Sequence, residues 1–350
     1  MRAVLYREFA GVVDVESVPD PAPPPGGVVV SVLATGLCRS DWHGWMGHDP
    51  DIGLPHVPGH EFAGTIAAVG AGVDRWHEGD RVTAPFVCAC GRCPACAAGD
   101  QQVCERQAQP GFTYWGSFAD YVVVPAAEVN LIALAGELPY AAAAALGCRF
   151  ATAYRAVADQ GRPRPGEWVA VHGCGGVGLS AVMVAAAAGA RVVAVDVSTA
   201  ALDLARRCGA ETGVLAGPDT DVADAVVQLT RGGAHVSLDA LGSEATCANS
   251  ILSLRRRGRH VQVGLLPAAL GRPRLPMDKV VAAELEILGS HGMPAHAYPR
   301  LLGLIAAGRL DPGLLVTQTL DLDAAPAALA AMDRQSQPGI RLIEPGRPVS

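Results

Sequence analysis

Charged side chains are scarce in this chain of 350 residues, where Asp, Glu, Lys and Arg together make up only 17%. The formal net charge at pH 7 is -7. A protein that binds nucleic acid or an anionic membrane needs clustered positive charge to neutralise phosphates. We therefore expect neither a nucleic acid nor a membrane among its partners.

Long apolar runs are missing as well. The N-terminal stretch "MRAVLYREFAGVVDVESV" alternates charged and apolar residues, unlike a signal peptide, and the alanine run at 141–145 is too short to span a bilayer. No repeat of 20–50 residues is found. We therefore expect a cytoplasmic protein. Thiols stay reduced in that compartment, so clustered cysteines favour metal binding or catalysis over disulfides.

The hydrophobic fraction of 50% is enough for a large core and favours two domains. Up to about residue 135, short Val-rich runs broken by Gly and Pro predict an all-β unit. From about residue 165, strand-like runs such as "EWVAVHG" and "RVVAVD" alternate with helical runs. This alternation predicts a parallel sheet with helices on both faces. Beyond about residue 290, two helical segments precede a last strand, "GIRLIEP".

The stretch "HGCGGVG" contains G-x-G-x-x-G at Gly173, Gly175 and Gly178, after a strand and at the start of a helix. Glycines let the backbone approach a pyrophosphate, whose charge sits at the helix N-terminus. Asp196 ends the next strand, where a carboxylate can bind the adenosine ribose and would repel a 2′-phosphate. The motif predicts NAD(H) in preference to NADP(H). The alternative is a glycine-rich packing turn.

The stretch "CGRCPACAAGDQQVC" has the spacing C-x2-C-x2-C-x7-C. Four thiolates at short spacing suit a tetrahedral zinc ion, and they leave no position for a substrate. We therefore expect a structural zinc site; an iron–sulfur cluster and free or redox-active thiols are the alternatives. The four residues of this site are Cys90, Cys93, Cys96 and Cys104.

A reaction must use other residues. Cys38 in "GLCRSDWHGW", His60 in "VPGHEFAG" and Cys148 in "ALGCRFATAY" are each weak signals when taken singly. Together, two Cys and one His would form an open zinc site whose fourth position accepts water or substrate.

These motifs, in this order and spacing, resemble the zinc-dependent alcohol dehydrogenases of the medium-chain dehydrogenase/reductase superfamily. The G-H-E of Gly59–Glu61, the Cys38 segment, the four-cysteine stretch and "GCGGVG" carry the resemblance. It implies an α/β fold in which a GroES-like β-rich catalytic domain is joined to a Rossmann domain with a doubly wound parallel sheet. We expect the catalytic domain at 1–148, completed by 291–350, and the NAD-binding domain at 149–290.

The resemblance also implies roles for individual residues. It makes Cys38, His60 and Cys148 the catalytic zinc ligands. Ser40 would accept the alcohol proton, His43 would end the proton relay, Asp41 would orient His60, and Glu61 could approach the metal during ligand exchange. The implied cofactor contacts are Arg39, Thr152, Gly173, Gly175, Gly176, Val177, Gly178, Asp196 and Arg341. The implied substrate-pocket residues are Phe86, Trp115 and Trp45, with His291 expected near the nicotinamide.

The expected function is NAD(H)-dependent interconversion of an alcohol and its aldehyde or ketone, with two zinc ions per chain. The aromatic pocket residues favour medium or bulky apolar substrates. Two alternatives stay open: a zinc-independent quinone or enone reductase on the same fold, and a non-catalytic NAD-binding redox sensor with zinc thiolates. We expect a homo-oligomer, either a tetramer or a dimer. In one departure from the family, "STAA" follows Asp196 where relatives often hold Lys or Arg.

Overall fold

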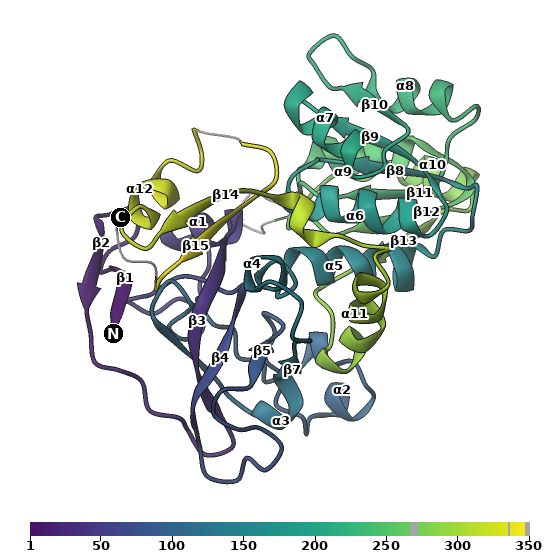
Figure 1. The fold of residues 1–350 in the computed structure, drawn as a ribbon. Helices are drawn as coiled ribbons and strands as arrows, with labels where there is room; N and C mark the ends of the chain where they lie inside the picture. The colour runs from purple at the N-terminus through teal and green to yellow at the C-terminus, as the bar shows by residue number, and fades with distance from the viewer. Residues whose placement is uncertain (267–271, 335–336, 347–350) are drawn as a thin grey trace.

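Two sheets form the two lobes of the molecule (Figure 1). The computed structural model describes residues 1–266, 272–334 and 337–346. The N-terminal segment builds most of the first lobe, and the C-terminal segment returns to complete its sheet. The middle of the chain forms the second lobe. None of the helices described is both long enough and apolar enough to cross a membrane.

The first lobe contains a seven-stranded sheet with the order β14-β15-β3-β4-β5-β7, and β6 pairs with β3. All its pairings are antiparallel except β14 with β15. Its strands are β3 (Val28–Leu37), β4 (Phe62–Val69), β5 (Arg81–Thr83), β6 (Tyr121–Val124), β7 (Ile132–Ala133), β14 (Val316–Asp321) and β15 (Ile340–Glu344). A separate antiparallel pair is formed by β1 (Arg2–Tyr6) and β2 (Val13–Ser17). The predicted β-rich unit is confirmed.

The second lobe contains a six-stranded sheet in which every pairing is parallel, with the order β10-β9-β8-β11-β12-β13. Its strands are β8 (Trp168–His172), β9 (Arg191–Asp196), β10 (Thr212–Leu215), β11 (Ala234–Asp239), β12 (Leu254–Gln262) and β13 (Glu286–Gly289). This is the strand order of a Rossmann fold, with its switch point between β8 and β11. The predicted doubly wound parallel sheet is therefore confirmed.

Short helices connect the strands of both lobes. In the first lobe and the C-terminal segment they are α1 (Arg39–Trp45), α2 (Pro94–Ala97), η1 (Gln101–Val103), α3 (Ala127–Asn130), α4 (Tyr140–Ala144), η4 (Ala295–Ala297), α11 (Tyr298–Ala306), η5 (Pro312–Leu315) and α12 (Ala325–Ala330). In the second lobe they are α5 (Arg149–Arg155), the π-helix η2 (Ala156–Gly161), α6 (Gly176–Ala187), α7 (Thr199–Arg207), α8 (Val222–Leu229), α9 (Glu244–Leu252) and α10 (Met277–Ala282).

One buried hydrophobic cluster spans both lobes, beside smaller clusters within each lobe. The largest buried cluster joins Ala34 and Ala63 of the first sheet to Phe150 of α5 and Val169 of β8. Helix α5 also packs along α6, the helix that follows the glycine loop. The chain therefore places the segment after Cys148 between the first sheet and the glycine loop, where it can contact both.

Candidate active site and zinc sites

Asp41 forms hydrogen bonds with both segments that carry Cys38 and His60. Cys38 lies between the end of β3 and the start of α1, and its backbone N–H donates to Asp41 Oδ2 (2.8 Å). Asp41 Oδ1 accepts the backbone N–H of Gly59 (3.1 Å) and lies 2.9 Å from His60 Nδ1. Because Asp41 is buried, these bonds are shielded from water. The structure thus brings the carboxylate and the imidazole together, as the sequence analysis expects.

The opposite ring nitrogen of His60 faces the two thiols. His60 Nε2 is buried and has no hydrogen-bond partner among the described residues, and the ring interacts with Cys38 and Cys148. Burial lowers the pKa of His60, but the charge and hydrogen bond of Asp41 outweigh it and raise this pKa well above its usual value. A histidine whose Nδ1 is held by a carboxylate presents Nε2 to a metal ion.

The donor atoms around His60 fit a zinc ion. One ligand atom each of Cys38, His60 and Glu61 lies within 4.8 Å of the others, and the half-buried Cys148 thiol interacts with His60 and Cys38. Both oxygens of Glu61 accept hydrogen bonds from the Arg149 side chain. Two thiols and one imidazole therefore remain available as donors. This is the ligand set that zinc takes in catalytic sites, where a fourth position stays open.

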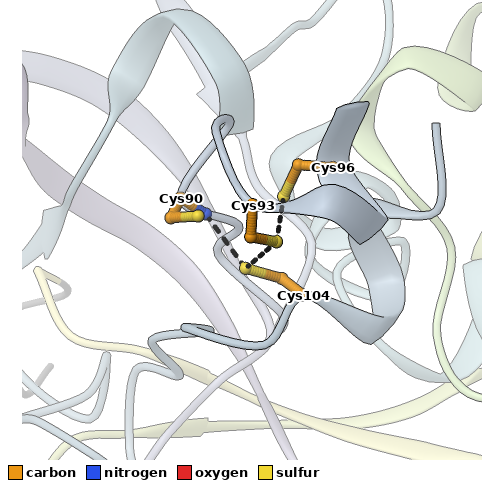
Figure 2. Close-up of side chains that lie close together, drawn as sticks. All are labelled: Cys90, Cys93, Cys96 and Cys104. Carbon is orange, nitrogen blue, oxygen red and sulfur yellow. Dashed lines mark hydrogen bonds between the residues drawn. The ribbon is translucent and has the colours of Figure 1, made fainter. Parts of the chain in front are cut away.

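The four cysteines of the other predicted site also lie together, at the turn that contains α2 and η1 (Figure 2). The Sγ atom of Cys93 lies 3.4 Å from that of Cys96 and 3.7 Å from that of Cys104. Four thiolates around one tetrahedral zinc ion would lie about 3.8 Å apart. The backbone N–H of Cys96 is the main cause that lowers the pKa of Cys93 to about 6. The donor set and its spacing fit zinc.

The other interpretations of this cysteine stretch are less compatible with these distances. A disulfide would need about 2.0 Å between sulfurs, and all ten cysteines are free. The four thiolates of an iron–sulfur cluster are shared among at least two iron atoms, so as a set they spread farther than the 4.8 Å within which these four sulfurs lie. Cys88 is outside the group, and the hydroxyl of Tyr114 donates to its sulfur (3.8 Å).

The predicted proton-relay residues lie on α1. The thiol of Cys38 is 3.8 Å from Ser40 Oγ, which places the hydroxyl beside a candidate ligand. His43 Nδ1 lies 2.9 Å from His48 Nδ1, so one ring must donate while the other accepts. Burial, then His48 and Arg39, lower the pKa of His43. A neutral imidazole at this place can accept a proton near neutral pH.

The glycine loop joins β8 to α6 at the carboxyl edge of the parallel sheet. Gly173 has φ +90°, and a side chain at Gly178 would collide with the carbonyl oxygen of Gly173. Asp196 at the end of β9 accepts the backbone N–H of Cys174 (2.7 Å) and of Ser198 (2.9 Å). The predicted acidic residue therefore lies directly beside the loop, at the switch-point side where dinucleotides bind in such sheets.

The other predicted cofactor contacts lie on α1, α5, α6 and β15. Thr152 lies in α5, and its hydroxyl is buried without a hydrogen-bond partner among the described residues. Such an orphaned polar atom next to a candidate site fits a missing ligand. Burial and the nearby Arg149 lower the pKa of Arg341, which lies on β15. Arg39 is exposed, and its guanidinium carbon lies 5.5 Å from the Trp42 ring centroid. Val177 and Gly176 open α6.

The three predicted pocket residues lie in different surroundings. The Phe86 ring packs against the rings of His60 (6.3 Å between centroids) and His291 (5.2 Å). Trp45 donates to the carbonyl of Gly11, and Trp115 donates to the carbonyl of Pro55. Among the three, Phe86 is the one with a ring contact to a candidate zinc ligand.

Sequence reasoning missed three residues. Phe112 packs against His60 at 5.1 Å between ring centroids, His48 pairs with His43, and Arg149 pairs with Glu61. The only signal for Arg149 was its place directly after Cys148. Nothing in the spacing indicates that its side chain turns toward a residue 88 positions earlier.

Comparison with known families agrees with this geometry. The family model described as "Alcohol dehydrogenase GroES-like domain" matches residues 24–134, and the model described as "Zinc-binding dehydrogenase" matches residues 176–307. An alcohol dehydrogenase of Geobacillus stearothermophilus is 36% identical over 292 residues, which cover 83% of this chain and 84% of the relative.

Solved structures give the same result over nearly the whole chain. An NAD-dependent alcohol dehydrogenase is 32% identical with a TM-score of 0.88, covering 99% of this chain and 100% of that one. A zinc-binding dehydrogenase from Sinorhizobium meliloti 1021 bound to NADP is 29% identical with a TM-score of 0.89, covering 98% and 99%. Benzyl alcohol dehydrogenase from Acinetobacter calcoaceticus is 25% identical with a TM-score of 0.90, covering 98% of each chain.

Proposed function

Because this chain belongs to the zinc-dependent alcohol dehydrogenases of the medium-chain dehydrogenase/reductase superfamily, we propose that it interconverts an alcohol and its aldehyde or ketone with NAD(H). One observation carries the proposal for this chain. The thiols of Cys38 and Cys148 lie beside His60 Nε2, which has no hydrogen-bond partner among the described residues, while Arg149 engages Glu61. This leaves three donors, one fewer than the four that a tetrahedral zinc ion takes, so a substrate oxygen could be the fourth.

Different residues would hold the metal, orient its ligands and transfer the proton. When bound, zinc supplies Lewis acidity that lowers the pKa of an alcohol, and the nicotinamide ring accepts a hydride. Cys38, His60 and Cys148 would hold the metal, and Asp41 keeps His60 turned toward it through Nδ1. Ser40 would take the alcohol proton, and His43 would pass it outward. In the reverse direction these groups return a proton to the carbonyl oxygen.

Cofactor binding is assigned to the edge between the lobes. Gly173, Gly175, Gly176 and Gly178 leave the N-terminus of α6 open for a pyrophosphate, with Arg39 and Arg341 as charged partners. Thr152 and Val177 would contact the nicotinamide. Cys90, Cys93, Cys96 and Cys104 would hold a second, structural zinc ion that touches no substrate.

Cofactor choice is proposed to depend on Asp196. Asp196→Asn removes the negative charge but keeps one oxygen to accept a backbone N–H. Without the repulsion of a 2′-phosphate, the ratio of kcat/KM for NADP to that for NAD should rise by roughly 10- to 100-fold. Steady-state kinetics with both cofactors measures it, with Asp203→Asn on the exposed side of α7 as control. An unchanged ratio would remove Asp196 from the selection.

The pairing of His43 with His48 leads to a pH prediction. His48 is one of the groups that lower the pKa of His43, so His48→Asn should raise it. Since His43 must be neutral to accept a proton, the acidic limb of the pH profile of kcat for alcohol oxidation should move to higher pH. The exposed His77 supplies the control variant His77→Asn. A profile that moves equally in both variants would exclude a specific role for His48.

The substrate is proposed to be a medium or bulky apolar alcohol or aldehyde. Phe86 and Phe112 place two aromatic rings against His60, beside the open zinc position. Trp115 and Trp45 are proposed to shape the outer pocket. A benzyl alcohol dehydrogenase is among the similar structures, which is in line with an aromatic-lined pocket.

The wider organisation is part of the same proposal. The catalytic domain would comprise 1–148 and 291–350, and the NAD-binding domain 149–290, with Cys148 and α5 at their junction. Assembly into a homotetramer or homodimer stays a prediction, as does a cytoplasmic location.

A substrate panel tests the activity. Primary and secondary alcohols with NAD, and aldehydes, quinones and enones with NADH, are followed by absorbance at the NADH band. The proposal expects turnover of alcohols and aldehydes. Turnover restricted to quinones or enones would replace it with the reductase alternative, and tight NADH binding without any turnover would replace it with the redox sensor.

A further inference from the structure

A buried ion pair stands between the zinc ligands and the glycine loop. Glu61 Oε1 accepts the backbone N–H of Arg149 (2.8 Å) and its Nε (2.9 Å). Glu61 Oε2 accepts Nε (2.8 Å) and Nη2 of the same guanidinium. Glu61 is fully buried and Arg149 is 6% exposed. A planar guanidinium in this forked arrangement fixes the direction of the carboxylate as well as its charge.

The pair lies where the carboxylate could reach the metal. A Glu61 oxygen is within 4.8 Å of the ligand atoms of Cys38 and His60. A carboxylate oxygen is also an accepted zinc ligand. Unless Glu61 is held elsewhere, it would compete with a substrate for the fourth position.

Arg149 is itself held in place from several sides. Its Nη1 donates to the carbonyl of Leu37, directly before Cys38 (3.2 Å). A Cβ at Gly176, the first residue of α6, would lie only 2.5 Å from Arg149 Cδ, and a Cβ at Gly36 would collide with both Glu61 and Arg149. Two glycines therefore make room for this pair, one on β3 and one at the glycine loop.

Stability alone gives a weak reason for this arrangement. A buried ion pair often contributes no more than well-packed apolar residues of similar size, because desolvation offsets the attraction. Here the charged pair is placed next to the ligands instead of in the apolar core of either lobe.

We propose that Arg149 is a positioning residue that holds Glu61 out of the coordination shell of the catalytic metal and so keeps the fourth position open for the substrate. The inference rests on the proposed function, since it assumes the metal site of Cys38, His60 and Cys148. In the substrate-ready enzyme, the Arg149 guanidinium would keep the Glu61 carboxylate in the position that the structure shows.

The test uses Arg149→Lys, which keeps the charge and removes the fork. Freed Glu61 should then bind the metal. The KM for the alcohol should rise by about tenfold with kcat within about threefold, and release of the catalytic zinc to a chelator should slow by about tenfold. Combining it with Glu61→Gln should return zinc release to near the wild-type rate, because a neutral amide is a poor zinc ligand. The control is Arg259→Lys, which removes a partly buried guanidinium that donates to Glu167 (3.0 Å) away from the site. It should change neither the KM nor the zinc release.

The outcomes separate positioning from packing. Zinc release from Arg149→Lys at the wild-type rate or faster would overturn the proposal. A slowed zinc release that Glu61→Gln fails to reverse would overturn it as well. If Arg149→Lys did not fold, Glu61→Gln alone decides, because the proposal expects its zinc release to match the wild type and a faster release would overturn it. Zinc release needs no substrate, so it remains decisive even if the alcohol panel failed and the proposed function with it.

Discussion

Cys38→Ser is expected to remove one of two zinc ions per chain and to lower alcohol turnover by at least about 10³-fold. The thiolate is one of three donors that the described residues leave to the metal, because Arg149 occupies both oxygens of Glu61. The variant would lack the Lewis acid that lowers the pKa of a bound alcohol and polarises a carbonyl. Zinc content by elemental analysis and NADH absorbance with the best alcohol of the panel measure the two effects.

The matched control is Cys208→Ser, a buried cysteine at the end of α7 that lies outside both cysteine groups. It should keep both zinc ions and full turnover. The account is contradicted if Cys38→Ser keeps both zinc ions and turns over the alcohol at the wild-type rate.

Cys93→Ser is expected to have the largest effect on stability. Apart from the cysteines, the hydrophobic cluster of this turn consists of Ala89, Ala95 and Val129, too little apolar surface to hold the segment. Metal binding must supply the missing free energy, as in other small zinc-held units. We expect loss of the second zinc ion, a Tm lower by about 5–10 °C, and tryptic cleavage at the exposed Arg92.

Turnover separates this site from the first. Because the four thiolates leave no open coordination position, Cys93→Ser assayed well below its Tm should keep turnover within about tenfold of the wild type. Loss of the zinc ion of Cys38 and His60 together with that of Cys93, or an unchanged Tm with one zinc ion lost, would show that the two sites are assigned wrongly.

More of the fold than of the site could be predicted from the sequence. Alternating apolar runs around β8, α6 and β9 carry their periodicity in the local sequence, so the parallel sheet followed from the pattern. Strand β14 was missed because "VTQTLD" is polar and its residues are exposed or partly exposed, so it shows no apolar alternation. The segment of α1 was recognised for its reactive side chains and not as a helix, because its seven residues are too few to show a helical period.

At the site, the residue types could be read from the sequence, but the directions of their side chains could not. Cys38, His60 and Cys148 come from three separate segments. Their residue types suggested an open zinc site, and the resemblance to a family then gave the three residues this role. Arg149 was overlooked because a charged residue after a ligand usually points to solvent, whereas here it turns back to Glu61. The side chains of Trp45 and Trp115 reach loop carbonyls, which depends on how the loops cross and not on the sequence around them.

The central claim is that the substrate oxygen binds a metal held by Cys38, His60 and Cys148. Replacing zinc with cobalt(II) gives a metal whose visible absorption reports its ligands, and the four-thiolate site has no open position through which a substrate could change its spectrum. We predict that a saturating alcohol or aldehyde shifts the cobalt bands of the wild-type chain, and that Cys38→Ser lacks this shift. An unchanged spectrum in a cobalt enzyme that still turns over the alcohol would contradict the account.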